Sequence, residues 1–306
     1  MKEKIRENQT KDILLELLAV SLLATGGIFV KFSQLGPINT GAYRVLFSLP
    51  LLFPLAYPQL KKLTLKDSGL LLAAGVFLAG DIALWNVSFS YTTVANANLL
   101  TNLTPFTVIP LSYLFFKERM PRFFIVGAII TIVGVVALLG GKINPSFENY
   151  FGDGLALAAS FFYAGFLLIC YHLRDRFSSS VIMFISGFGS VASLFFIGGA
   201  TEGIQHPEIW ADFWPLIGLA VLLQVFGHNL LAYCQGKVNV NLSSIICLAQ
   251  PAIASIYSLF IFSEKLSFSE LVGIVIIIIG VYLVKAQYTA KKEIVNNKEQ
   301  QLLKND

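Results

Sequence analysis

The amino-acid sequence predicts an all-α polytopic membrane protein in which ten transmembrane helices form two inverted five-helix repeats. Three observations lead to this fold class. Of the 306 residues, 56% are hydrophobic and 13% are charged, whereas a soluble domain carries about 25% charged residues. Long apolar segments run through the whole chain, and one pattern within them occurs twice. The low charge content excludes a globular enzyme with an ordinary water-exposed surface.

Ten apolar segments have the length that a helix needs to cross a bilayer. A chain in lipid must satisfy its backbone hydrogen bonds internally, which leaves helices or closed barrels, and these segments are too long for barrel strands. Each is therefore predicted to be a helix. They lie at about residues 13–32, 38–57, 69–88, 93–115, 122–140, 152–172, 180–200, 212–234, 240–262 and 269–286.

A pattern in the fourth and fifth segments recurs in the ninth and tenth. Residues 104–135 and 250–281 align without a gap, and each copy holds an apolar helix with a proline, an acidic corner and a second apolar helix with two glycines. Duplicated hydrophobic units are typical of proteins built from internal repeats. We expect the matching residues to be structural, with the glycines allowing close helix packing: Pro105 and Pro251, Glu118 and Glu264, Gly127 and Gly273, Gly134 and Gly280.

The basic residues are distributed unevenly between the connecting segments. If the N-terminus is cytoplasmic, eighteen Lys and Arg residues fall on the cytoplasmic side and two, Lys142 and Lys265, fall outside. This bias predicts that both termini are cytoplasmic. Because each half has an odd number of spans, the second half is inverted relative to the first. The expected organisation is a cytoplasmic N-terminal segment (1–12), a first repeat (13–140), a linker (141–151), a second repeat (152–286) and a disordered cytoplasmic tail (287–306).

These residues resemble EamA-type members of the drug/metabolite transporter superfamily. The resemblance extends over about 13–286 and depends on the segments ANANLLTNLTPFTVIPLSYLFFKER (95–119) and NLSSIICLAQPAIASIYSLFIFSEK (241–265). It implies a carrier of the inner, or plasma, membrane that moves small metabolites by alternating access and often exports them. It also implies a cavity between the halves, lined mainly by the first, third and fourth spans of each. The two halves are expected to be EamA-like repeats.

Polar residues within the spans of the first half are candidates for the cavity. Asp81 carries a carboxylate that costs about 2.5–3.5 kcal/mol near the bilayer centre. It could couple a proton or cation, or neutralise a substrate amine, or simply pair with Arg44, for which we expect a structural role. Trp85, one turn later, could add an aromatic wall. Asn98 and Asn102 share a helix face and could bind a polar ligand or only a neighbouring helix.

The second half offers a different set of polar residues. Gln224 and His228 share one face of the eighth span, and Asn229 follows them. His228 could relay a proton, or it could be merely hydrogen-bonded. Tyr163 in the sixth span and Gln250 in the ninth could supply further polar edges. None of these residues matches a first-half candidate at the repeat offset, and an asymmetric substrate needs such an asymmetric cavity.

The chain lacks the motifs of several other functions. It has no GxxxxGK[ST] phosphate loop, no HExxH and no GxSxG, and its three cysteines have neither disulfide nor metal-ligand spacing. We therefore expect no enzyme, no cofactor and no metal. The leading hypothesis is a secondary transporter for an amino acid, an amine or a related metabolite, with a possible coupling proton or cation and a possible homodimer. The alternatives are an intramembrane enzyme acting on a lipid-linked substrate and a membrane scaffold without transport.

Overall fold

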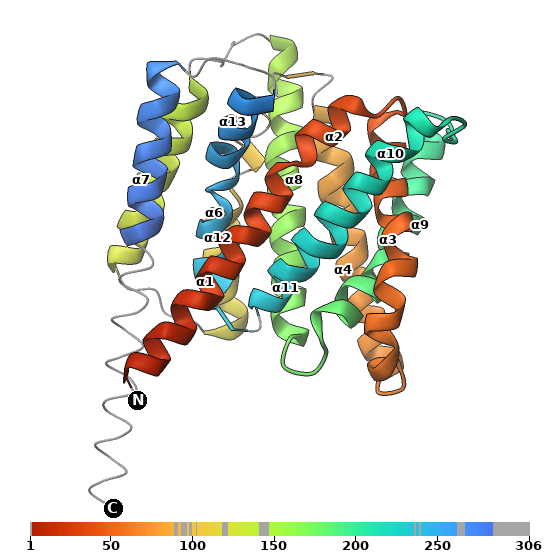
Figure 1. Cartoon of the computed structure of the whole chain (residues 1–306), viewed down its shortest axis with the longest axis horizontal. Coiled ribbons are helices and arrows are strands. Elements are labelled where there is room, and N and C mark those ends of the chain that lie inside the picture. The colour runs from red at the N-terminus through yellow and green to blue at the C-terminus, as the bar shows by residue number, and fades with distance from the viewer. Residues whose placement is uncertain are drawn as a thin grey trace, which may run out of the picture.

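The computed structural model of the protein describes residues 2–88, 91–92, 97, 100–101, 103–117, 122–140, 147–235, 237–238, 240–261 and 267–283. Within these residues every regular element is a helix, and the helices stand side by side as a bundle (Figure 1). The predicted all-α fold with ten helical spans in two halves is confirmed. The first half contains α1 (Lys2–Ala24), α2 (Gly26–Phe32), α3 (Pro37–Leu60), α4 (Leu65–Ser88), α6 (Thr104–Phe116) and α7 (Arg122–Gly140).

The second half contains α8 (Phe147–Leu173), α9 (Ser179–Thr201), α10 (Trp210–Gly218), the π-helix η1 (Leu219–His228), α11 (Asn229–Gln235), α12 (Val240–Cys247), α13 (Gln250–Ile261) and a last helix at Phe268–Leu283. Within the described residues, three spans are interrupted in ways that the hydropathy pattern does not predict. The first changes course at Thr25, the eighth passes through η1, and the ninth breaks between α12 and α13.

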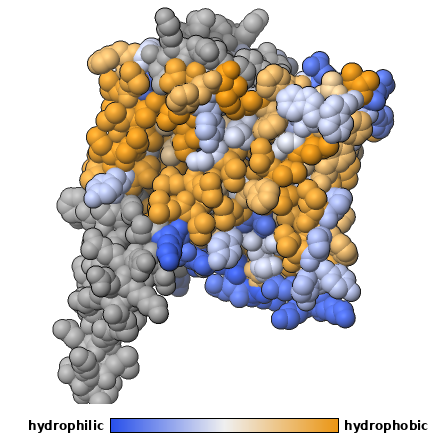
Figure 2. Space-filling view, viewed as in Figure 1, coloured by the Kyte–Doolittle hydropathy of each residue, from blue (hydrophilic) through white to orange (hydrophobic). Residues whose placement is uncertain are grey.

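Six of the described segments are long and apolar enough to cross a membrane. They are Lys11–Val30, Leu65–Ser88, Tyr150–Leu173, Ser179–Thr201, Trp210–Cys234 and Leu242–Ile261. Helix α3 is equally long, but Arg44 and the prolines Pro50, Pro54 and Pro58 lower its hydropathy. A broad apolar surface covers the face of the bundle seen in Figure 2, and hydrophilic residues gather at its lower end.

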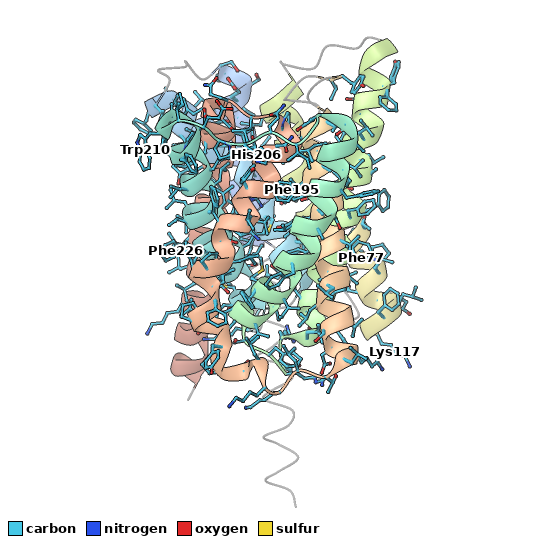
Figure 3. The ribbon with its side chains drawn as sticks, turned by 90° about the vertical axis from the view of Figure 1, so that its right-hand side faces the viewer. Phe77, Lys117, Phe195, His206, Trp210 and Phe226 are labelled. Carbon is cyan, nitrogen blue, oxygen red and sulfur yellow. The ribbon has the colours of Figure 1, made fainter. Side chains whose placement is uncertain are left out.

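The two ends of the bundle carry different parts of the chain. Lys117 lies at the lower end in Figure 3, the end at which Figure 1 places the N-terminus, while His206 and Trp210 lie at the upper end. Phe77 and Phe226 point outward from the sides between these ends, as expected of residues that contact lipid.

The best-packed part of the bundle combines α3 and α4 of the first half with α8 and α9 of the second. Small residues allow this close approach: Gly75 of α4 lies directly against the backbone of α9, and the Ser190 hydroxyl of α9 donates to the Gly75 carbonyl oxygen (2.8 Å). At the lower end, Arg176 forms a two-pronged ion pair with Asp67, at the start of α4 (2.6 and 2.8 Å). These contacts tie the two halves together.

The fifth and tenth spans meet through three of the four glycines of the repeat. Gly134 of α7 faces Gly273 and Ile277 of the last helix, and Gly280 faces Thr131 of α7. A β-carbon at any of these three glycines would collide with the opposing backbone, so the two helices approach closely only because side chains are absent. Gly127 accepts a hydrogen bond from the Thr131 hydroxyl (2.8 Å).

Candidate functional site

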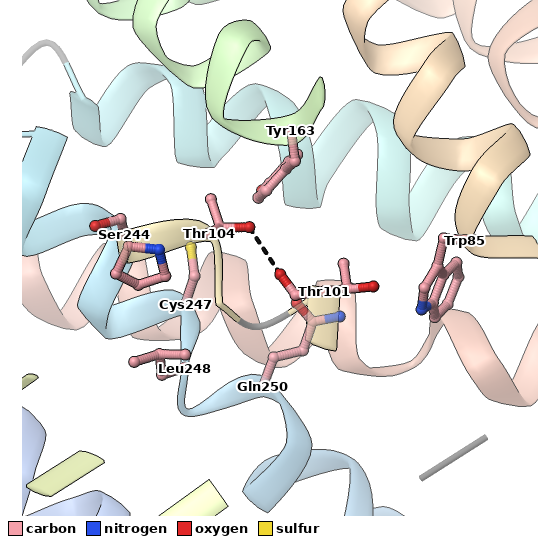
Figure 4. A pocket seen from close by; sticks show the side chains of 9 residues that line it. Trp85, Thr101, Thr104, Tyr163, Ser244, Cys247, Leu248 and Gln250 are labelled. Carbon is pink, nitrogen blue, oxygen red and sulfur yellow. Dashed lines mark hydrogen bonds between the residues drawn. The ribbon is translucent and has the colours of Figure 1, made fainter. Parts of the chain in front are cut away.

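A pocket lies where both halves of the protein meet. The space inside it, including the part open to solvent, is about 410 Å³. The first half and the second half both contribute to its wall, which combines two aromatic rings with hydroxyl, thiol and amide groups (Figure 4). The lining residues are Trp85, Thr101, Thr104, Pro105, Tyr163, Ser244, Cys247, Leu248 and Gln250.

The pocket forms at helix ends rather than along continuous helices. Helix α12 ends at Cys247, α13 starts at Gln250, and Leu248 in the connecting turn lines the pocket. On the other side, α6 starts at Thr104, whose hydroxyl donates to the Thr101 carbonyl oxygen (2.8 Å; Figure 4). Irregular backbone at membrane depth is tolerated where it lines a cavity, and discontinuous helices form the binding sites of many carriers.

A charged cluster of buried Arg44 and half-buried Asp81 lies next to this pocket. The Arg44 Nε atom donates to Gln224 Oε1 (3.2 Å) across the interface between α3 and η1. Arg44 and Asp81 interact electrostatically with each other. Each of them also interacts electrostatically with Tyr163, which lines the pocket. Trp85 lines the pocket one turn after Asp81, so the cluster and the pocket are continuous through Trp85 and Tyr163.

The charges of this cluster are only partly satisfied by the protein. Among the described residues, Arg44 makes one hydrogen bond through Nε and Asp81 makes none, and the two side chains are not in direct ion-pair contact. Asp81 is half-buried rather than enclosed. A carboxylate and a guanidinium in an apolar bundle are stabilised by partners or by water, and the described residues supply few such partners here.

Two of the predicted residues, Gln224 and His228, lie in the π-helix η1. Gln224 is fully buried with its Nε2 atom unpartnered, and His228 Nδ1 lies 3.3 Å from the Leu223 carbonyl oxygen. The His228 ring meets Phe166 edge-on, with centroids 6.2 Å apart. π-Helical turns are frequent at functional sites because the wider turn redirects side chains. Here the π-helical turns carry Gln224, which accepts the hydrogen bond from Arg44.

The structure places the remaining predicted residues at varying distances from the pocket. Tyr163 and Gln250 line it, and so does Pro105, which we expected to be only structural. Asn229 instead bonds Ser180 of α9 (3.3 Å) and is not among the lining residues. Pro251 is buried at the start of α13. Asn98, Asn102, Glu118 and Glu264 lie outside the described residues.

Sequence reasoning did not single out several residues that the structure brings to the site. Thr101, Thr104, Ser244 and Leu248 line the pocket, but an isolated hydroxyl or a leucine in an apolar span is too common to be a signal. Glu16 could have been found by the criterion that identified Asp81, because it is a carboxylate inside the first span. Among the described residues, no group of three or more His, Cys, Asp and Glu could hold a metal ion.

Apolar helices of membrane-spanning length around a polar pocket at interrupted helices define a multi-pass integral membrane protein of the transporter class. The sequence profile of the EamA-like transporter family matches residues 10–140 and 150–286, once in each half. The chain therefore belongs to the EamA-like transporter family, and it is a membrane transporter rather than an enzyme.

Similar proteins agree with this assignment. An uncharacterized transporter of Archaeoglobus fulgidus is 27% identical over 273 residues, which cover 87% of this chain and 93% of the relative. An uncharacterized transporter of Clostridium kluyveri is 24% identical over 84% of this chain and 86% of its own length, and the uncharacterized transporter YetK of Bacillus subtilis is 29% identical over 72% and 69%. One crystal structure has the same fold, with a TM-score of 0.76 at 15% identity over 90% of this chain and 97% of its own.

Proposed function

We propose that the protein is a secondary transporter that moves a small zwitterionic metabolite, such as an amino acid, across the inner membrane by alternating access. The observation that carries this proposal is the pair of opposite, incompletely satisfied charges of Arg44 and Asp81 beside the pocket. A substrate carboxylate fits the guanidinium, and a substrate ammonium fits the carboxylate. An amine without a carboxylate would use Asp81 alone and leave Arg44 unpaired, so a zwitterion is favoured.

The remaining pocket residues support a small, partly apolar ligand. Trp85 and Tyr163 offer aromatic faces that bind a hydrocarbon side chain or an ammonium group. Thr104 and Gln250 add hydrogen-bonding groups on opposite halves of the protein. The site is shared between the two halves. Rocking of one half against the other would therefore expose it alternately to each side of the membrane. We further propose that the termini are cytoplasmic and that the direction is export.

Counterflow of labelled metabolites in proteoliposomes tests this proposal. A panel of neutral, acidic and basic amino acids and of simple amines should show exchange for at least one amino acid. Each charge-assisted contact contributes about 1.5–3 kcal/mol, so Asp81→Asn and Arg44→Lys should each weaken apparent affinity roughly 10-fold or more. The matched control is Asp175→Asn, because Asp175 is exposed in the loop after α8.

Three results would contradict the proposal. Transport of amines with the same loss of affinity in both variants would argue against a zwitterion. Equal exchange by wild type, Asp81→Asn and Arg44→Lys would remove the charged cluster from the substrate site. Absence of exchange for every member of the panel would argue against this substrate class.

A further inference from the structure

The first span contains a carboxylate that the proposed substrate site does not use. Glu16 of α1 is fully buried, and neither of its carboxylate oxygens has a hydrogen-bond partner among the described residues. Glu16 interacts with Ser243 of α12, which is also fully buried and whose hydroxyl has no hydrogen-bond partner within the described part of the chain. Two unpartnered polar groups from different halves therefore face each other in an apolar interior.

Among the residues that the structure describes, no cation acts on Glu16 as a counter-charge. Helix α1 packs against α11, α12, α13 and η1. The titratable groups that influence Glu16 or are influenced by it are Asp12 on its own helix, Cys234 of α11 and Cys247 of α12. Lys237 influences Cys234 but is not among the groups that act on Glu16, and its ammonium pairs with Asp12 at 3.6 Å. From η1, His228 bonds the Leu223 carbonyl and faces Phe166.

These surroundings favour a proton over a metal ion as the ligand of Glu16. An ionised carboxylate without a partner is strongly disfavoured in an apolar interior, whereas the neutral acid is tolerated and gains a donor that Ser243 can accept. Hard metal cations take about six or more oxygen ligands. The described residues that act on Glu16 add only the Ser243 hydroxyl and the carboxylate of Asp12, which already pairs with Lys237, so they supply too few oxygens for such a cation.

The position of Glu16 connects it to the pocket through a short helix. Helix α12 presents Ser243 to Glu16, while its neighbours Ser244 and Cys247 line the pocket. Cys247 interacts electrostatically with Glu16, and it lines the pocket together with Tyr163. A movement of α12 that opens the pocket would therefore also change how much water reaches Glu16.

We propose that Glu16 is a proton-binding site of this transporter and that α12 couples its occupancy to the state of the substrate pocket. In the arrangement described here, the carboxylate holds a proton as the neutral acid. When α12 moves away from α1 and water enters, the acid releases that proton to water and is left as the carboxylate; rebinding a proton from water precedes closure. Proton binding itself is independent of the proposed function, whereas its use in coupling rests on that function.

Infrared difference spectroscopy of the purified protein in lipid tests proton binding without any substrate. The wild type should show the carbonyl band of a protonated carboxylic acid near neutral pH, and the band should disappear when the sample is made alkaline. Glu16→Gln should lack this band, and Glu16→Asp should shift it, which keeps the test valid if one of them folds poorly. Asp12→Asn, one turn earlier on the same helix, is the matched control and should keep the band.

The same variants test coupling in proteoliposomes. With the amino acid found by counterflow as the probe, a pH gradient should accelerate wild-type flux several-fold, and Glu16→Gln should lose this acceleration. If the wild type shows no flux at all, the proposed function fails while the infrared result still decides proton binding. A carboxylic-acid band that persists in Glu16→Gln, or a Glu16-dependent band that responds to sodium ions at constant pH, would overturn the proton site. An infrared band without any effect of a pH gradient on wild-type flux would overturn the coupling role.

Discussion

The start of α3, the helix that carries Arg44, is held by a carboxylate from the second half. Glu202, at the end of α9, accepts hydrogen bonds from the backbone N–H groups of Ile38 (3.0 Å) and Asn39 (3.1 Å) and from Asn39 Nδ2 (2.8 Å). The first N–H groups of a helix have no partner within the helix, and the helix dipole favours an anion there. Glu202 therefore caps α3 from the other half of the protein, and we predict that Glu202→Ala destabilises the bundle.

The size of this effect can be estimated from the three contacts. Replacing a capping side chain by Ala costs about 0.5–2 kcal/mol, and a hydrogen bond to a charged group contributes about 1.5–3 kcal/mol. Because the three bonds share one carboxylate that is only half-buried, their contributions do not add in full. We expect Glu202→Ala to lower the free energy of unfolding by about 2 kcal/mol, a change of roughly 30-fold in the ratio of folded to unfolded protein. Glu202→Gln should lose about half as much, since it keeps one acceptor oxygen.

Denaturant unfolding in mixed lipid–detergent micelles measures this difference. The matched control is Glu208→Ala, because Glu208 lies in the same connection between α9 and α10 and its side chain accepts none of the hydrogen bonds at the start of α3. If Glu202→Ala unfolds at the same denaturant concentration as Glu208→Ala, within about 0.5 kcal/mol, the carboxylate does not act as a cap and the reasoning is refuted.

Three further predictions concern helix packing, pocket access and surface charge. Gly273→Ala should separate the last helix from α7 and reduce cross-linking between cysteines placed on the two helices; Gly69→Ala, whose new methyl group meets nothing within 4 Å, should leave that cross-linking unchanged. In a variant lacking Cys170 and Cys234, a small thiol reagent should label Cys247 and the transported amino acid should slow the labelling, because Cys247 alone among the three cysteines lines the pocket; labelling at one rate with and without substrate would count against this site. A hydrogen bond with Tyr233, together with Asp12, raises the pKa of Lys237 above its ordinary 10.5, so its contribution to stability is present below about pH 10.5 and is lost as the pH rises through the folded-state value. Thermal unfolding should therefore show Lys237→Met as less stable than wild type at neutral pH and equal to it only in strong alkali.

Much of the fold was predictable from the chain because its physical causes are local. A run of apolar residues of bilayer length must be helical in lipid whatever surrounds it, so the predicted spans at 69–88 and 180–200 correspond to α4 and α9. The repeat at 104–135 and 250–281 is likewise visible as residue identity. The interruptions at Thr25 and in η1 were not predictable, because they depend on how these segments pack against neighbouring helices.

The candidate site was only partly predictable from the sequence, because its geometry depends on contacts between helices. Sequence alone identified Asp81, since an ionisable group inside an apolar span is unusual wherever it points, and it singled out Trp85 and Tyr163 as aromatic groups with a polar atom. It also grouped Asn229 with Gln224 and His228, but the tertiary structure turns Asn229 towards Ser180. Arg44 was expected to be structural, yet the fold leaves its charge and that of Asp81 close together without direct ion-pair contact, beside the pocket.

The sequence by itself therefore determined the class of protein: a duplicated set of apolar helices in a membrane, with polar residues that differ between its halves. Only the tertiary structure decided which of those polar residues share a pocket and which carboxylate, that of Glu16, is buried without a hydrogen-bond partner among the described residues. The physical reason is that hydropathy and repeat identity depend on the order of residues along the chain. Burial, pairing and the pocket depend instead on contacts between helices far apart in sequence, such as α1 with α12 and α3 with η1.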